Sequence, residues 1–130
     1  MYEHDTDGVM VRVEPDYLED ESSPDESRFV WSYTIEIENH TDQPVQLVSR
    51  KWAITDMMGR TEHVQGRGVV GEQPVIHPGE RFRYTSGAPL RTPSGFMQGS
   101  FEMRRQSGEV FAARIPGFSL DRPDDRASLH

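Results

Sequence analysis

The sequence predicts an all-β protein, an antiparallel β-sandwich of about seven strands. Apolar and polar residues alternate through several short segments, and no stretch has the period of a helix. Turn-forming residues such as Gly, Pro, Asn and Asp separate these segments at regular intervals. Neither an internal repeat nor a linker divides the 130 residues. These observations indicate a single sandwich domain, which we place at residues 9–121.

The chain begins with a segment, residues 1–8, that we expect to be flexible. Between residues 8 and 16 three valines at every second position alternate with Met10, Arg12 and Glu14, which predicts a half-buried strand. Acidic residues mixed with Ser and Pro follow at residues 17–27. This composition predicts a mobile, solvated loop, and the carboxylates lack the glycine-punctuated spacing of a calcium loop.

The strongest predicted strand is Phe29–Asn39, in which aromatic and β-branched residues alternate strictly with polar ones. Residues 40–44 have turn chemistry. A second long strand follows at Val45–Asp56, but its apolar residues change parity along its length. The change predicts a β-bulge or bend near residues 49–51.

Shorter strands fill the rest of the domain. A turn at residues 56–60 leads into a strand at 62–66, and a glycine-rich segment precedes a strand at 81–86. After a Pro-containing loop at residues 87–95, a hairpin pairs 97–103 with 110–115 around a tight turn. Residues 116–120 return two apolar side chains to the core, and we expect residues 122–130 to be a disordered tail.

Composition excludes several classes of function. There is no cysteine, so disulfides, thiolate catalysis and Cys-ligated zinc are absent. The net charge of −8 argues against a general nucleic-acid binder. Without a basic region followed by an apolar run, the N-terminus is not a signal peptide, and no apolar run is long enough to span a bilayer. We therefore expect a cytoplasmic protein with no membrane insertion.

Charge is distributed unevenly along the chain. Residues 1–27 carry ten acidic residues and one arginine, whereas residues 50–105 carry nine basic and five acidic residues. Thirteen of the fourteen basic residues are arginine, which suits bidentate recognition of carboxylate or phosphate. A general preference for arginine over lysine explains the same count without any function.

The glycine-rich segment contains the spacing G-x-G-x-x-G at Gly66, Gly68 and Gly71. In a dinucleotide fingerprint a helix leaves this turn, but Pro74 and Pro78 leave no room for one here. It is also not a P-loop, because an acidic residue follows the last glycine. The segment is predicted to bridge two strands without capping a helix.

Several stretches resemble the ApaG family, also called CorD. The matching text runs through residues 66–74 (GRGVVGEQP), 78–80 (PGE) and 84–87 (YTSG), with further matches at 33–39 (YTIEIEN) and 115–120. The segments occur in order from residue 9 to residue 120, which makes the resemblance specific. An arginine, Arg67, stands between the first two glycines, where the family commonly has an acidic residue.

The resemblance implies an immunoglobulin-like or fibronectin type III-like sandwich. It also implies an association with cobalt resistance and magnesium efflux, and related eukaryotic domains are supposed to bind proteins. The family has no established catalytic residues. We therefore predict a non-enzymatic accessory domain with no cofactor, which binds a protein partner.

The alternative function is binding of a phosphorylated small ligand, such as pyrophosphate or a nucleotide. Backbone amides of a glycine-rich turn can form an anion-binding nest without a helix. The candidate loop comprises Gly66, Arg67, Gly68, Val69, Val70 and Gly71, and the candidate anion-contacting side chains are Arg50, Arg81 and Arg83. A purely structural explanation is also open, in which the glycines supply positive φ angles and the two valines anchor the loop on the core.

Other chemistry has weaker support. None of the five histidines forms a metal-binding pattern, although His63 and His77 flank the glycine segment, so no metal site is predicted. No nucleophile elbow surrounds a serine. Met57, Met58 and the loop at residues 89–93 are plausible contacts for a partner, since methionine adapts to varied surfaces, but the methionines could equally cap the core.

Overall fold

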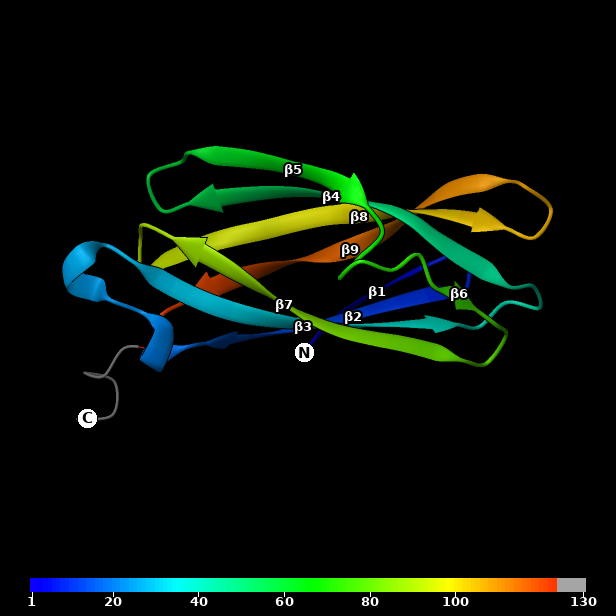
Figure 1. Ribbon diagram of the computed structural model, residues 1–130, viewed down its shortest axis with the longest axis horizontal. Helices are drawn as coiled ribbons and strands as arrows, with labels where there is room; N and C mark the ends of the chain where they lie inside the picture. The colour runs from blue at the N-terminus through cyan, green and yellow to red at the C-terminus, as the bar shows by residue number, and fades with distance from the viewer. Residues whose placement is uncertain (124–130) are drawn as a thin grey trace.

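The computed structural model describes residues 1–123 and confirms the predicted antiparallel sandwich (Figure 1). The four-stranded sheet has the order β1-β2-β3-β7, and in the five-stranded sheet β5-β4-β8-β9 lie side by side while β6 also pairs with β4. The strands are β1 (Tyr2–Thr6), β2 (Val9–Tyr17), β3 (Phe29–Asn39), β4 (Val45–Asp56), β5 (Thr61–Arg67), β6 (Val75–Ile76), β7 (Arg81–Leu90), β8 (Ser94–Arg105) and β9 (Val110–Asp121). Two short 3-10 turns, Glu19–Glu21 and Pro24–Glu26, lie between β2 and β3.

The core lies between the two sheets and follows the predicted alternation. Along β3 the residues at odd positions are buried, and the polar residues between them are partly exposed. Trp31, Phe101 and Phe118 are the largest fully buried side chains. No helix among residues 1–123 has the length and apolar character needed to cross a membrane.

The N-terminal segment differs from the expectation of flexibility, because Tyr2–Thr6 forms β1. Its residues are mostly exposed, so the sequence shows no apolar alternation that would predict this strand. Backbone pairing with β2 holds it in place. The ring of Tyr2 lies 6.1 Å from that of Phe118. The Thr6 hydroxyl accepts a hydrogen bond from the Arg114 amide, which connects the edges of the two sheets on this side. The disordered tail expected at residues 122–130 lies outside the described residues from 124 onward.

The predicted irregularity in β4 is present slightly earlier than expected. The pairing of β4 with β8 shifts between Leu47 and Ser49, so Val48 is the extra residue. Beyond it the inward face changes parity, and Arg50 lies opposite the fully buried Phe101. Residues opposite each other in an antiparallel pair share a face, so the bulge places an arginine on the inner side of the sheet.

Candidate functional site

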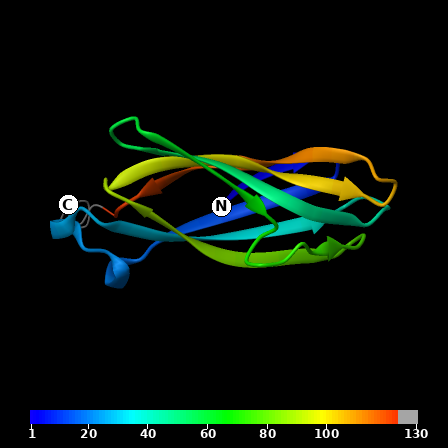
Figure 2. The same cartoon turned by 45° about the horizontal axis from the view of Figure 1, so that its top comes forward.

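The glycine-rich segment joins β5 to β6, and both strands pair with the same edge of β4. The Gly68 amide donates to the Val48 carbonyl at 2.8 Å, and the Leu47 amide donates to the Pro74 carbonyl at 3.0 Å. Residues 69–75 contain no helix. The segment bridges two strands, as predicted, and in Figure 2 the chain leaves β5 and descends across the open side of the sandwich.

A tight turn forms the tip of this segment. The Val69 amide donates to the Glu72 carbonyl at 2.8 Å and the Glu72 amide donates back at 2.9 Å. Val70 and Gly71 between them have φ angles of 44° and 81°, which is the pattern of a type I′ turn. Val69 is 1% exposed and anchors the loop on the core, but Val70 is 57% exposed, so the expectation that both valines act as anchors is wrong.

Two of the predicted site residues, Arg50 and Gly66, meet beside the loop. The Arg50 guanidinium donates from Nη1 to the carbonyls of Arg67 at 3.2 Å and Gly68 at 2.9 Å. A Cβ on Gly66 would lie 2.7 Å from that nitrogen, so glycine leaves the space that the guanidinium fills. Arg50 therefore reinforces the loop through its carbonyls, while the amides of Gly68, Val69 and Glu72 are already bonded within the fold.

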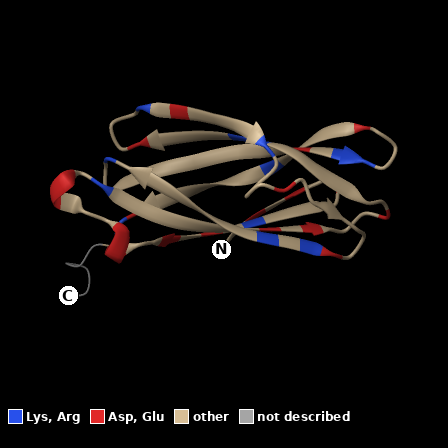
Figure 3. Ribbon diagram, in the orientation of Figure 1, with Lys and Arg blue, Asp and Glu red and all other residues tan. Residues whose placement is uncertain are grey.

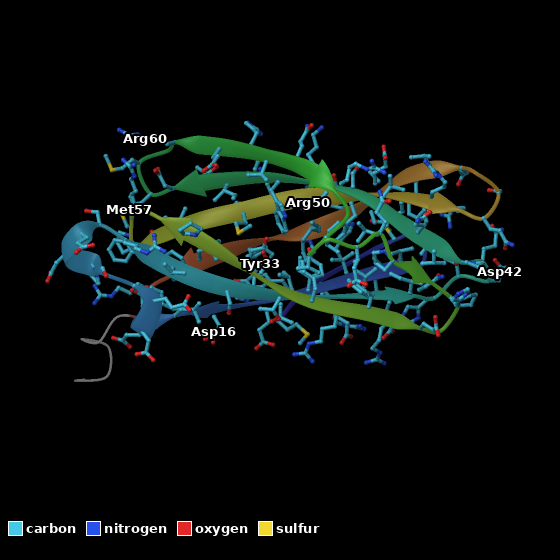
Figure 4. All side chains as sticks on the ribbon, in the orientation of Figure 1. Asp16, Tyr33, Asp42, Arg50, Met57 and Arg60 are labelled. Carbon is cyan, nitrogen blue, oxygen red and sulfur yellow. The ribbon has the colours of Figure 1, made fainter. Side chains whose placement is uncertain are left out.

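Several polar groups lie near the half-buried Arg50 (Figure 4, where Arg50 on β4 lies above Tyr33 on β3). Burial raises the pKa of Tyr33 and of Tyr84, and the positive charge of Arg50 offsets part of that rise in both phenols. Within residues 1–123, the Tyr84 hydroxyl and Trp52 Nε1 are buried without a hydrogen-bond partner. This side of the core thus combines one arginine with aromatic rings that carry unpaired polar atoms.

Arg81 and Arg83 lie in the other sheet, on β7, and do not join Arg50. Arg81 forms ion pairs with Glu38 at 3.1 Å and Glu36 at 3.6 Å, and Arg12 pairs with the same two carboxylates. Partial desolvation raises the pKa of Glu38. Its hydrogen bond with His40 and the charges of Arg81 and Arg12 have the opposite effect and together outweigh desolvation, so the pKa lies below its ordinary value. Arg12, Arg81, Glu36 and Glu38 therefore form a network of matched charges on the outer face of the four-stranded sheet, which Arg83 does not join.

A hollow of about 680 Å³ lies beside the loop, on the outer face of the five-stranded sheet. We call it the outer hollow; it is lined by Ser49, Arg50, Lys51, Gln65, Gly66, Arg67, Ser100, Glu102, Val110, Phe111 and Ala112. Three of these residues, Arg50, Gly66 and Arg67, are predicted from the sequence. Lys51, Ser100 and the neighbouring Arg114 are not, because only strand register shows that they share a face.

The turn at residues 56–60 and the loop at residues 89–93 meet at one end of the sandwich, which we call the loop end. The Met57 amide donates to Thr92 Oγ1 at 3.1 Å. Met57 is 55% and Met58 74% exposed, so neither caps the core. A groove of about 530 Å³ lies beside them, with Ile54 and Leu90 among its lining residues. The acidic β2–β3 connection is at the same end, on the left of Figure 3.

The histidines that flank the glycine segment do not form a metal centre with neighbouring acidic residues. Among residues 1–123, no group of three or more His, Asp or Glu side chains is arranged to hold a metal ion. The His77 amide donates to the Glu80 carboxylate at 3.1 Å, which closes the turn before β7.

Comparison with known proteins agrees with this architecture. The family model described as the ApaG domain matches residues 19–105. Protein ApaG from Maricaulis maris is 74% identical over 130 residues, covering 100% of both chains, and Protein ApaG from Rhodospirillum centenum is 55% identical over 127 residues, covering 98% of each. A crystal structure from Bordetella pertussis, described as an ApaA protein, has a TM-score of 0.86 at 43% identity and covers 88% of this chain and 94% of that one. The C-terminal domain of wzt, at 10% identity and a TM-score of 0.57, covers 95% of this chain and 78% of its own and shares the fold alone. The chain belongs to the ApaG family.

Proposed function

We propose that this chain is a non-enzymatic interaction domain that binds a protein partner through its loop end. The observation that supports this is the junction of two separate segments, in which Met57 is bonded to Thr92 and two large apolar side chains remain exposed. The expected association of the family with cobalt resistance and magnesium efflux would then act through the partner.

The loop end has the composition of a protein contact surface. Exposed methionines supply apolar area that can adapt to a partner. The adjacent groove offers the apolar side chains of Ile54 and Leu90, while Arg28, Arg60 and Arg91 lie at its polar margin. Arginine is enriched in protein interfaces, where it combines charge with apolar contact area.

Photo-crosslinking in the native host tests the proposal. A photoreactive residue in place of Met58 should capture one dominant protein, and Met57→Glu in the same chain should abolish the capture. The matched control places the photoreactive residue at Val110, which is 50% exposed in the β8–β9 hairpin. Equal capture from both positions, or none from Met58, would contradict the proposal.

Binding of a phosphorylated small ligand by the glycine-rich loop is the second candidate. Its support is that Arg50, Gly66 and Arg67 are all among the residues that line the outer hollow, although the Arg50 guanidinium itself is bonded to the carbonyls of Arg67 and Gly68. Amides that are already bonded within the turn are less available to an anion. A titration with pyrophosphate that shifts only the amides of residues 66–72 would favour this candidate.

A further inference from the structure

The cations on the outer face of the five-stranded sheet outnumber the carboxylates near them. Lys51, Arg67, Arg104 and Arg114 all lie on this face, and within residues 1–123 none of them forms an ion pair. Glu102 is the carboxylate that lines the outer hollow with them. On the four-stranded sheet, by contrast, Arg12 and Arg81 are both paired, and Arg83 is the strand arginine that forms no ion pair within residues 1–123. An acidic chain therefore has one locally basic face.

Strand register places these side chains around a polar floor. Lys51 on β4 pairs across to Ser100 on β8, and Ser100 pairs to Arg114 on β9. Neighbouring strands are about 4.8 Å apart, so about 10 Å separates the backbones that carry the two cations. Arg67 lies diagonally from Lys51, because it pairs with Ser49, and diagonal neighbours are about 7–8 Å apart. Long side chains at these positions can converge on one ligand above Ser100.

The floor of the hollow is low because its residues are small. Ser49, Ser100 and Ala112 are small residues of neighbouring strands on this face, and Glu102 lies between Ser49 and Ala112 in the same row. The volume of about 680 Å³ is within the range of about 300–1,000 Å³ found for small-molecule sites. The serine hydroxyls can donate hydrogen bonds to an anionic oxygen, and the flanking ammonium and guanidinium groups can make charge-assisted bonds.

We propose that the outer hollow binds a small multivalent anion, one with at least two adjacent phosphate or carboxylate groups, between Lys51, Arg67 and Arg114. This site shares no lining residue with the groove at the loop end, so a result that refutes one proposal leaves the other unaffected. It also differs from the second candidate function, because the ligand contacts side chains of the sheet and not the amides of the turn. Arg67 is the residue that the two descriptions share.

Pyrophosphate, followed by amide NMR of the full chain, tests the site. We expect shifts at residues 49–51, 100–102 and 112–114, with a Kd below about 1 mM at low salt. Raising the salt to about 0.3 M should weaken binding several-fold, because exposed charges are screened. Shifts confined to residues 66–72 would overturn the assignment and favour the turn.

Charge variants make the test specific. Lys51→Glu with Arg114→Glu should weaken pyrophosphate binding at least about tenfold, and Glu102→Gln should strengthen it about two- to fivefold. Arg83→Glu, on the outer face of the opposite sheet, is the matched control and should change Kd less than about twofold. An equal loss in the Arg83 variant would show non-specific attraction and overturn the proposal.

Citrate in place of pyrophosphate distinguishes a general polyanion site from one selective for phosphate. Met57→Glu should leave this binding unchanged, so failure here is distinct from failure of the partner proposal.

Discussion

Two alanine substitutions in the same loop separate a steric requirement for glycine from a conformational one. Gly68 and Gly71 both have positive φ angles, 61° and 81°, so alanine at either costs about 1–2 kcal/mol of unfolding free energy. The surroundings differ. A Cβ on Gly68 would lie 2.1 Å from the Glu72 carbonyl oxygen, whereas a Cβ on Gly71 would have nothing within 4 Å.

The contact at Gly68 makes its substitution much more costly. Real Cβ contacts are not shorter than 3.0 Å, so the carbonyl must move by 3.0 − 2.1, or about 0.9 Å. That movement breaks the paired bonds between Val69 and Glu72, each worth about 0.5–1.5 kcal/mol. We therefore expect Gly68→Ala to lower the unfolding free energy by about 2–5 kcal/mol and Gly71→Ala by about 1–2 kcal/mol.

Urea denaturation followed by tryptophan fluorescence measures both values, since Trp31 and Trp52 are buried in the core. Gly79→Ala, with a φ of 82° and no neighbour within 4 Å, is a second conformational control. Equal losses for Gly68→Ala and the two controls would refute the steric argument. A changed slope of the urea transition would indicate an altered denatured state, and the comparison would then need a second probe.

Three further predictions concern the core and the charge network. Asn39→Leu should lower the unfolding free energy measured by urea denaturation by about 3 kcal/mol or more. The buried side-chain amide donates to the carbonyls of Gln43 and Ile76, and its oxygen accepts two hydrogen bonds from Thr41. A loss below about 1 kcal/mol would contradict this role. The pKa of Glu38 is lowered in the fold, so its contribution is present above its unfolded pKa and disappears as pH falls through the folded value. The stability advantage of wild type over Glu38→Gln should therefore shrink between about pH 5 and pH 3, and an advantage independent of pH would exclude this linkage. Gly99→Ala should be among the most damaging substitutions in thermal unfolding, since its Cβ would lie 2.2 Å from the Lys51 carbonyl oxygen; an unchanged Tm would disprove the close approach.

The sequence predicts best those strands that bury one face. Phe29–Asn39 has the predicted bounds because its alternation reports directly which residues enter the core. The strands Tyr2–Thr6 and Val75–Ile76 are not predicted, because they bury little apolar area and leave no clear alternation in the sequence. Backbone pairing with a neighbouring strand keeps them in place. These two strands account for the difference between the seven expected and the nine observed.

The candidate site is only partly readable from sequence for a related reason. Gly66 is predicted from the glycine spacing and Arg50 as a basic side chain that could reach the loop, and pairing of β4 with β5 places the two opposite each other. Arg81 and Arg83 are equally basic and lie near the loop in sequence, yet they belong to the other sheet. Sheet membership depends on long-range pairing, to which local pattern gives no access.

Two hydrogen bonds between the sheets also constrain how the chain folds during synthesis. The hydrogen bond between Thr6 and Arg114 spans 108 residues, and the bond from the Trp31 indole to the Asp121 carbonyl spans 90. A ribosome releases the amino-terminal strands long before their carboxyl-terminal partners. The apolar face of β1, β2 and β3 therefore stays uncovered until the second sheet has been synthesised. Such distant pairing is slow to form, so the apolar face of the early strands stays open to aggregation until β9 has emerged.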